Sequence, residues 1–254
     1  LYGKTLMNIN EDLIIKNKSY YTSGSLGFNY VFNDRHSVGA TYEVNINPYS
    51  RGGWNSLMDV WKNGSKTESY TNDMYCRFKS RPTQDITAYY AGQIGKVSIE
   101  WNGEIYLRKT GQTQYSEETG IEGGDSRTIE SDFTADSWMH ASKLVLSFPV
   151  WKGTLKVGNE FTESCRANLY TIDEQGTDLP GKTDDQVKES NLAAFVSYGL
   201  RLNKVELNAG LRYEHVSSNY YNTGGDYWSE ENKDYFVPDQ SRKYDHFFPN
   251  VSLT

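Results

Sequence analysis

A strict alternation of apolar and polar side chains in residues 192–217 limits the folds open to this chain more than any other sequence feature. One face of its second half carries Val205, Leu207, Ala209, Leu211 and Tyr213. A period of two predicts a β-strand with one apolar face, and a turn at residues 202–204 divides the stretch into two antiparallel strands. About 13 such residues, tilted by about 45°, span roughly 30 Å, the thickness of a bilayer's hydrocarbon layer.

Three more hairpins of the same kind precede this one. They occupy residues 21–47, 86–107 and 144–161, with short turns at 33–36, 95–96 and 151–153. Alternation also marks residues 1–15 and 244–254, which we interpret as parts of further strands. About ten long strands are therefore expected.

Long connections are expected between the hairpins. Residues 48–81 are interpreted as a loop that contains its own hairpin at Asn63-Gly64 and stands outside the main sheet. Residues 111–136, 168–188 and 220–242 are polar and acidic, and we expect them to be loops as well. Short turns would then lie at one rim of the sheet and long loops at the other.

This arrangement predicts an all-β fold, an antiparallel up-and-down transmembrane β-barrel segment with short periplasmic turns and long extracellular loops. A water-soluble sandwich shows the same alternation with its apolar face on a core, so it remains an alternative. In a sandwich Val205, Leu207 and Leu211 would be shielded by protein, whereas in a barrel they would face outward.

Composition excludes several other classes. The chain has 254 residues and a net charge of -7, which argues against a nucleic-acid partner. No run approaches the 18 or so apolar residues of a membrane helix. The two cysteines, Cys76 and Cys165, make neither a disulfide framework nor a metal cluster, and we expect them to be unpaired, with a single bridge as the alternative.

Two segments resemble a known family. Residues 210–214 read GLRYE, and after a long connection residues 247–253 read FFPNVSL. This pair resembles a recurrent pair of strands in the barrels of TonB-dependent outer-membrane receptors. Residues 89–103 resemble a hairpin of the outer-membrane β-barrel family found at the C-terminal side of such receptors.

The resemblance implies a receptor in the cell outer membrane, with a barrel of about 22 strands around a plug domain, that imports a bulky nutrient through TonB. No plug or TonB-contact segment is recognisable here, so residues 1–254 are expected to be an internal fragment of one barrel domain. The implied partners are outer-membrane lipid, the remainder of the barrel, a plug domain, the TonB complex through parts outside this chain, and a surface lipoprotein. No nucleic acid and no cofactor are expected.

Two sets of residues are candidates for contact with a solute. The polar face of the strands is expected to line the lumen, either as a hydrated wall or in contact with a plug or solute, through Glu43, Glu100, Glu104, Glu160, Glu206, Arg212 and Glu214. Loop aromatics could stack on a flat ligand or simply pack within their loops: Trp54, Trp61, Tyr115, Tyr227, Trp228 and Tyr235.

No catalytic or metal motif is found. The histidines, His36, His140, His215 and His246, are scattered, and no nucleophile elbow, zinc motif or phosphate loop is present. The chain is therefore not expected to be an enzyme. A ten-stranded outer-membrane barrel enzyme remains an alternative, which requires a histidine and an acid that meet at one rim.

Overall fold

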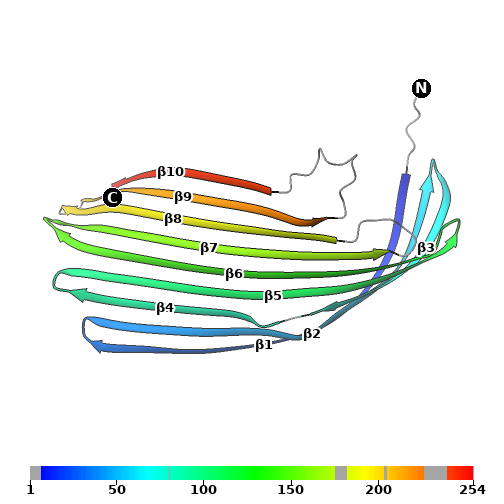
Figure 1. Cartoon of the computed structure of the whole chain (residues 1–254), viewed down its shortest axis with the longest axis horizontal. Coiled ribbons are helices and arrows are strands. Elements are labelled where there is room, and N and C mark those ends of the chain that lie inside the picture. Colours follow the sequence, from blue (N-terminus) through cyan, green and yellow to red (C-terminus); the bar gives the residue numbers. More distant parts are fainter. Residues whose placement is uncertain (1–6, 80, 175–181, 203–204, 226–238, 254) are drawn as a thin grey trace, which may run out of the picture.

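Ten antiparallel strands form one curved sheet in the computed structural model of this protein (Figure 1). The structure describes residues 7–79, 81–174, 182–202, 205–225 and 239–253. The strands are β1 (Met7–Asn33), β2 (His36–Lys62), β3 (Ser65–Phe78), β4 (Thr83–Ile94), β5 (Val97–Glu122), β6 (Arg127–Val150), β7 (Gly153–Glu174), β8 (Lys182–Leu202), β9 (Val205–Gly225) and β10 (Asp239–Leu253). Within these residues no helix is long and apolar enough to cross a membrane.

The strands follow one another across the sheet with one exception. From β5 to β10 each strand pairs with its neighbours in the chain. Between β2 and β5, however, β3 and β4 occupy a single position one after the other. Near the short turns β2 and β5 both pair with β4, and toward the opposite end both pair with β3.

The predicted short turns lie at one end of the sheet, on the left in Figure 1. Residues 34–35, 95–96 and 151–152 form them, and the backbone of Gly95 has a positive φ of 60°. At the predicted turn 202–204, β8 ends at Leu202 and β9 begins at Val205, and residues 203–204 lie outside the described part of the chain. The predicted arrangement of hairpins with their turns on one rim is confirmed.

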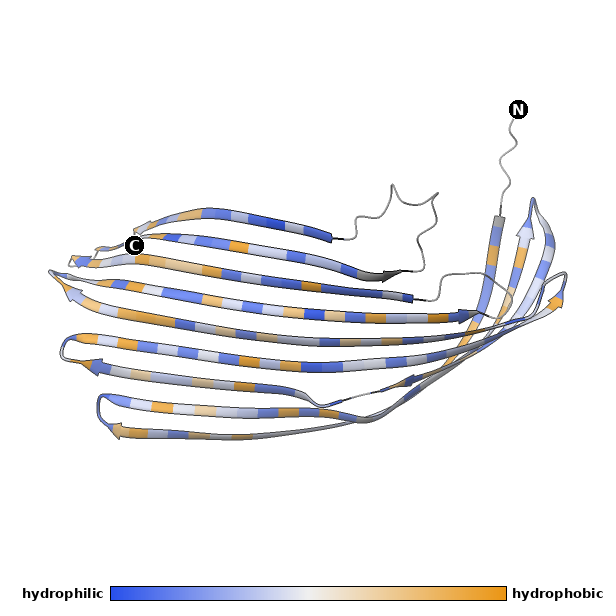
Figure 2. Cartoon of the chain, in the orientation of Figure 1, coloured by the Kyte–Doolittle hydropathy of each residue, from blue (hydrophilic) through white to orange (hydrophobic). Residues whose placement is uncertain are grey.

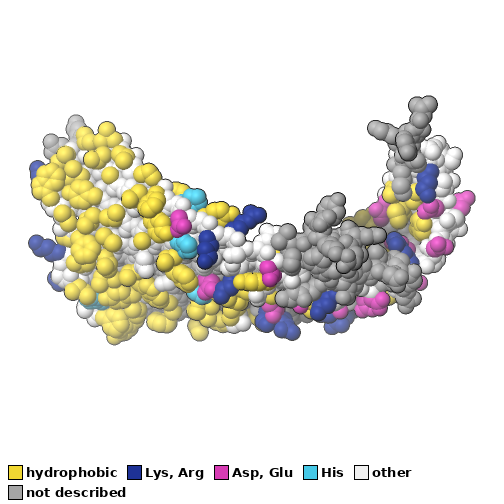
Figure 3. Space-filling view, turned by 45° about the horizontal axis from the view of Figure 1, so that its top comes forward, with side chains coloured by type: hydrophobic (Ala, Val, Ile, Leu, Met, Phe, Trp, Pro, Cys, Tyr) yellow, Lys and Arg dark blue, Asp and Glu magenta, His cyan; other side chains and the backbone are white. Residues whose placement is uncertain are grey.

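Register places the apolar side chains of neighbouring strands on the same face. Val157 of β7 is opposite Val196 of β8, which is in turn opposite Leu211 of β9. Figure 2 shows the alternation of hydropathy along the strands, and Figure 3 shows hydrophobic side chains gathered toward the turn end. We call these residues the apolar band: on β5 it extends from Val97 to Leu107, about the 9–11 residues that a tilted strand needs to cross a bilayer.

The band is exposed, which decides between barrel and sandwich. Val205, Leu207 and Leu211 are 46%, 38% and 44% exposed, and the described residues form one sheet with no second sheet packed on it. The prediction of a transmembrane barrel segment, with about ten strands, is confirmed.

The predicted long connections are mostly strand. Residues 111–136 continue β5 to Glu122 and begin β6 at Arg127, so only a short connection remains. Likewise β7, β8, β9 and β10 extend into 168–188 and 220–242, where residues 175–181 and 226–238 lie outside the described part. These strands have 21 to 26 residues in β5 to β9, about twice the number that a bilayer requires, and backbone pairing continues where no lipid enforces alternation.

Residues 48–81 do not stand outside the sheet. They form the far half of β2 and all of β3, and they pair with β1 and β5 as well as with each other. The hairpin at Asn63-Gly64 is nevertheless present, with φ values of 52° and 83° that suit a two-residue turn. The strand expected at residues 1–15 is also not separate from the first hairpin: residues 7–15 continue into the same strand, β1, which only bulges between Tyr20 and Thr22.

Candidate functional site

The charged side chains of the polar face form a network across β6, β7 and β9. The carboxylate of Glu160 on β7 accepts from the Nη1 of Arg212 at 3.1 Å and lies 3.4 Å from the Nζ of Lys143. Arg212 also pairs with Glu214 along its own strand. The guanidinium thus ties two carboxylates together through its fork of donors.

A small residue on the intervening strand makes this reach possible. Ala193 of β8 lies between Glu160 and Glu214 in the register and is only 1% exposed, so Arg212 passes over a short side chain. Beside it, the ring of Phe195 extends over Gly158 of β7, and the Nζ of Lys143 lies 5.9 Å from that ring's centroid. The charged groups therefore lie beside the short side chain of Ala193 and the ring of Phe195.

The seven residues predicted to line the lumen share this face of the sheet. The register carries Glu214 to Glu160 and Glu160 to Lys143, which is opposite Asn102 between Glu100 and Glu104. Their common face is as expected, and their role as a lumen wall stays a prediction. Alternation around Leu144 and Leu146 places Lys143 on the same face, so parity alone could have identified this missed member.

Charge on this face is unevenly distributed. Glu206 pairs with Arg201 at 3.3 Å, and the network described above neutralises Glu160. On the β2 and β4 side, Glu43 is directly opposite Asp85, so two carboxylates meet. That part of the polar face is acidic, which favours cations over anions near it.

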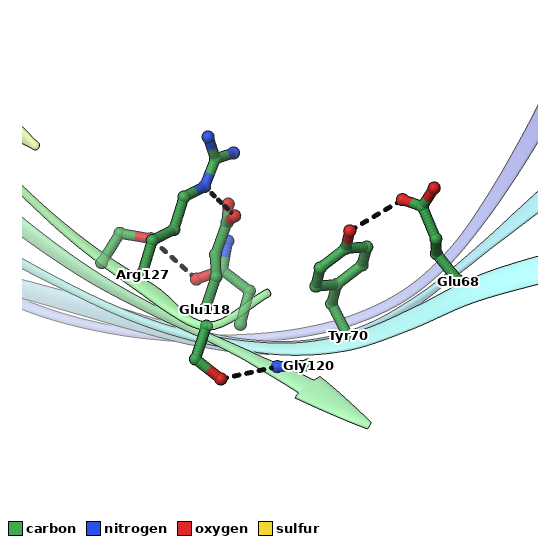
Figure 4. A network of polar contacts seen from close by, with 8 residues as sticks. Glu68, Tyr70, Glu118, Gly120 and Arg127 are labelled. Carbon is green, nitrogen blue, oxygen red and sulfur yellow. Dashed lines mark hydrogen bonds and ion pairs between the residues drawn. The ribbon is translucent and has the colours of Figure 1, made fainter. Parts of the chain in front are cut away.

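The end of the sheet farthest from the short turns carries a second polar network (Figure 4). Arg127 of β6 donates from Nε to Glu118 of β5 at 2.6 Å, and the Tyr70 hydroxyl of β3 donates to Glu68 at 2.7 Å. The Tyr70 hydrogen bond and the nearby Lys62 ammonium hold the pKa of Glu68 below its usual range. In return, Glu68 raises the pKa of Tyr70.

Asp59 is held in a similar way on β2. Its carboxylate lies 2.7 Å from the Lys66 ammonium and accepts from the Ser69 hydroxyl at 2.7 Å. Both contacts favour the ionised form, so they lower the pKa of Asp59. These ion pairs connect the two strands of the Asn63-Gly64 hairpin in the region where the strands extend beyond the apolar band.

The predicted loop aromatics do not form one site. Trp54, Trp61 and Tyr115 lie within β2 and β5 rather than in loops, which corrects the sequence interpretation. Trp54 and Trp61 are seven residues apart on one continuous strand, so their side chains point to opposite faces. The other three, Tyr227, Trp228 and Tyr235, lie outside the described residues. Ligand stacking by this set stays a prediction.

The histidine and cysteine side chains, which could act in catalysis or bind a metal, are dispersed over the described strands. His36, His140 and His215 lie on β2, β6 and β9, where they contact Tyr90, Glu163 and Asp245 respectively. Cys76 and Cys165 are both free and buried. Within the part of the chain that the structure describes, no three His, Cys, Asp or Glu side chains gather in a way that could hold a metal ion.

Comparison with known proteins gives one family match. The model of a family described as "Outer membrane protein beta-barrel family" matches residues 95–254, more than half of the chain. A search of curated proteins gives no match.

Solved structures with a similar fold share little sequence. They include the ferric yersiniabactin uptake receptor FyuA from Yersinia pestis, at 11% identity and a TM-score of 0.47, over 98% of this chain and 44% of that one. The siderophore receptor PiuA from Acinetobacter baumannii has 10% identity and a TM-score of 0.42, over 100% and 47% of the two chains. The outer membrane protease OmpT from Escherichia coli has 12% identity and a TM-score of 0.30, over 97% and 95%. The chain thus spans less than half the length of the two receptors.

Proposed function

Because the chain belongs to the outer membrane protein beta-barrel family, we propose that it forms part of the wall of a TonB-dependent transporter that imports a bulky nutrient. Membership of that family also places the protein in the cell outer membrane, as its sequence predicts. The TonB-dependent class is supported by the resemblance of residues 210–214 and 247–253 to strands of such receptors.

The observation that carries the proposal is the difference between the two faces of the sheet. One face bears the exposed apolar band, which suits lipid, and the other bears the charged network around Glu160 and Arg212. A polar face that crosses the bilayer behind an apolar one is the arrangement of a barrel wall around an aqueous or plugged lumen. In this proposal the seven charged residues of the polar face line that lumen.

The edges of the sheet indicate which partners the wall requires. Among the described residues β1 pairs only with β2, and β10 pairs only with β9. An unpaired strand edge within a bilayer is costly, because no water is present to bond its backbone groups. Further strands of the same barrel therefore cover these edges, and the partners beyond them are a plug, the TonB complex and a surface lipoprotein.

Orientation follows from the two ends of the sheet. We place the short turns on the periplasmic side and the strand extensions beyond the apolar band, including the network around Glu118 and Arg127, outside the cell. A bulky nutrient would then first meet the extended strands and afterwards the charged wall.

Uptake measurements test the proposed function. The gene is deleted from its host, and growth is measured on single bulky nutrients, in parallel with a strain that lacks TonB. Loss of growth on the same nutrient in both strains is expected, and plasmid-borne wild-type protein should restore it in the first strain only. Growth that depends on the protein but not on TonB would contradict the TonB-dependent class.

The enzyme alternative predicts a different result. The purified protein would hydrolyse peptide or lipid, and substitution of one histidine by alanine, for example His140→Ala, would abolish the activity. A transporter wall shows no such activity in any of the four histidine variants.

A further inference from the structure

The sheet has a break where β3 and β4 succeed one another. On β2 the ladder with β4 ends at Asn45 and the ladder with β3 begins at Ser50. On β5 the corresponding limits are Leu107 and Gln112. Residues 46–49 of β2 and 108–111 of β5 therefore have no strand between them, and the connection from β3 to β4 crosses this gap, where the Lys79 N–H donates to the Gly111 carbonyl at 2.7 Å.

A cavity of ≈ 680 Å³ lies at this break. Its volume is within the range of about 300–1,000 Å³ that is typical of sites for small molecules. Four cationic residues are among those that line it, namely Arg51, Arg81, Arg108 and Lys109, and no Asp or Glu is among its described lining residues. In a chain with a net charge of -7, this concentration of positive charge is unusual.

The cations differ in how strongly they are already engaged. Lys109 pairs with Asp136 at 2.7 Å, and that carboxylate lines the neighbouring hollows rather than this cavity. The guanidinium of Arg51 lies 5.1 Å from the ring centroid of Tyr49 and 6.0 Å from that of Tyr75. In the register Arg51 is opposite Arg77, which is opposite Thr113, so its side chain lies on the other face of the sheet from Arg108. Arg108 shares the face of Trp54 and Tyr106.

The rest of the lining is neutral and largely suited to hydrogen bonds or stacking. Amide groups come from Asn17, Asn45, Asn47 and Gln112, and aromatic rings come from Tyr21, Trp54, Phe78 and Tyr106. Guanidinium forks match the two oxygens of a carboxylate or phosphate, while rings accept a flat body with little loss of entropy. Both features are present within one cavity.

We propose that this cavity binds a small molecule that combines a carboxylate or phosphate group with a flat or apolar body. Arg108 binds the anionic oxygens, and Trp54 and Tyr106, which lie on the same face of the sheet as Arg108, contact the flat part. The site belongs to the barrel wall, and binding there does not require that the protein import its ligand. Failure of binding and failure of TonB-dependent uptake are therefore separate outcomes.

Calorimetric titration of the purified protein in detergent micelles tests the site, with phenyl phosphate as the probe and phenol as its neutral counterpart. Phenyl phosphate should bind and phenol should bind at least about tenfold more weakly, because a charge-assisted hydrogen bond contributes about 1.5–3 kcal/mol. Arg108→Gln should weaken phenyl phosphate binding about tenfold or more.

Arg77→Gln is the matched control. It removes the same charge at a position on β3 that does not line the cavity. It should leave affinity within about twofold, since its charge is not in contact with the probe. Arg108→Lys should restore part of the affinity lost in Arg108→Gln, which separates charge from folding. An equal loss of affinity in Arg77→Gln, or unchanged affinity in Arg108→Gln, would overturn the proposal.

The source of the anion is settled by a second titration, in nanodiscs that contain either phosphatidylglycerol or only phosphatidylcholine. If phenyl phosphate binds more weakly in the phosphatidylglycerol nanodiscs than in micelles, and as tightly in the phosphatidylcholine nanodiscs as in micelles, the site is assigned to a lipid headgroup. Equal binding in both assigns it to a soluble anion. Absence of phenyl phosphate binding in micelles and in both nanodiscs would refute the site.

Discussion

At the scale of single residues, Gly158 leaves the space through which the Phe195 ring crosses β7. A Cβ added there would meet that ring and would lie 2.7 Å from the carbonyl oxygen of Leu144. Carbon and oxygen atoms do not approach this closely without displacement, and the carbonyl belongs to a neighbouring strand. The charged network around Glu160 therefore depends on a residue that carries no charge.

Gly158→Ala should lower the free energy of unfolding by about 1–3 kcal/mol, the usual cost of overpacking. Urea unfolding of the protein in lipid vesicles measures this change. Gly53→Ala is the control, because its added Cβ would lie 3.5 Å from the Met74 carbonyl, an ordinary contact. Equal destabilisation in both variants would contradict the assigned role of Gly158.

At the scale of elements, the β2–β3 hairpin is held by ion pairs beyond the apolar band. Asp59 and Glu68 both have a lowered pKa, because Lys66 and Tyr70 respectively donate hydrogen bonds to their carboxylates. The folded hairpin therefore binds protons less readily than the unfolded chain. These contacts stabilise the hairpin above the unfolded pKa of about 4, and the contribution is lost as pH falls through the lower folded values.

Amide hydrogen exchange in the β2–β3 hairpin should therefore speed up as pH is lowered below about 4, after correction for the intrinsic rate of exchange. The double variant Asp59→Asn/Glu68→Gln should show little of this dependence, because it has no carboxylate to protonate at either position. Asp73→Asn, on the same hairpin, serves as the control and should retain the wild-type profile. An unchanged pH profile in the double variant would disprove the role of the two carboxylates.

Sequence patterns predicted the elements near the turns and failed beyond them for a physical reason. Around Val205 or Val157 one face of each strand meets lipid, so alternation is strict and readable. Residues 111–136 and 48–81 extend beyond the apolar band, and polar residues occur there on both faces. Backbone pairing alone maintains those strands, so Trp54 and Tyr115 were assigned to loops although they lie in the sheet. The break that brings Trp54 and Arg108 to one cavity depends on long-range register, which no local pattern records.

At the scale of the whole molecule, the assignment of one face to lipid and the other to the lumen predicts that two neighbouring positions tolerate a charge unequally. Val196 of β8 is 42% exposed within the apolar band, and Ser197 points to the polar face. Val196→Arg should lower stability in a bilayer by about 2–4 kcal/mol, the cost of a cation facing the middle of the membrane, whereas Ser197→Arg should cost less than about 1 kcal/mol. Urea titration in lipid vesicles compares the two, and equal costs would contradict the assignment.

The single position shared by β3 and β4 sets the parity of the wall. Among the described residues, ten strands then occupy nine positions, and because every neighbouring pair is antiparallel, β1 and β10 run in the same direction. The two edges cannot join each other in an antiparallel seam. A barrel that is antiparallel throughout must add an odd number of positions to these nine, which gives the even total typical of bacterial outer-membrane barrels.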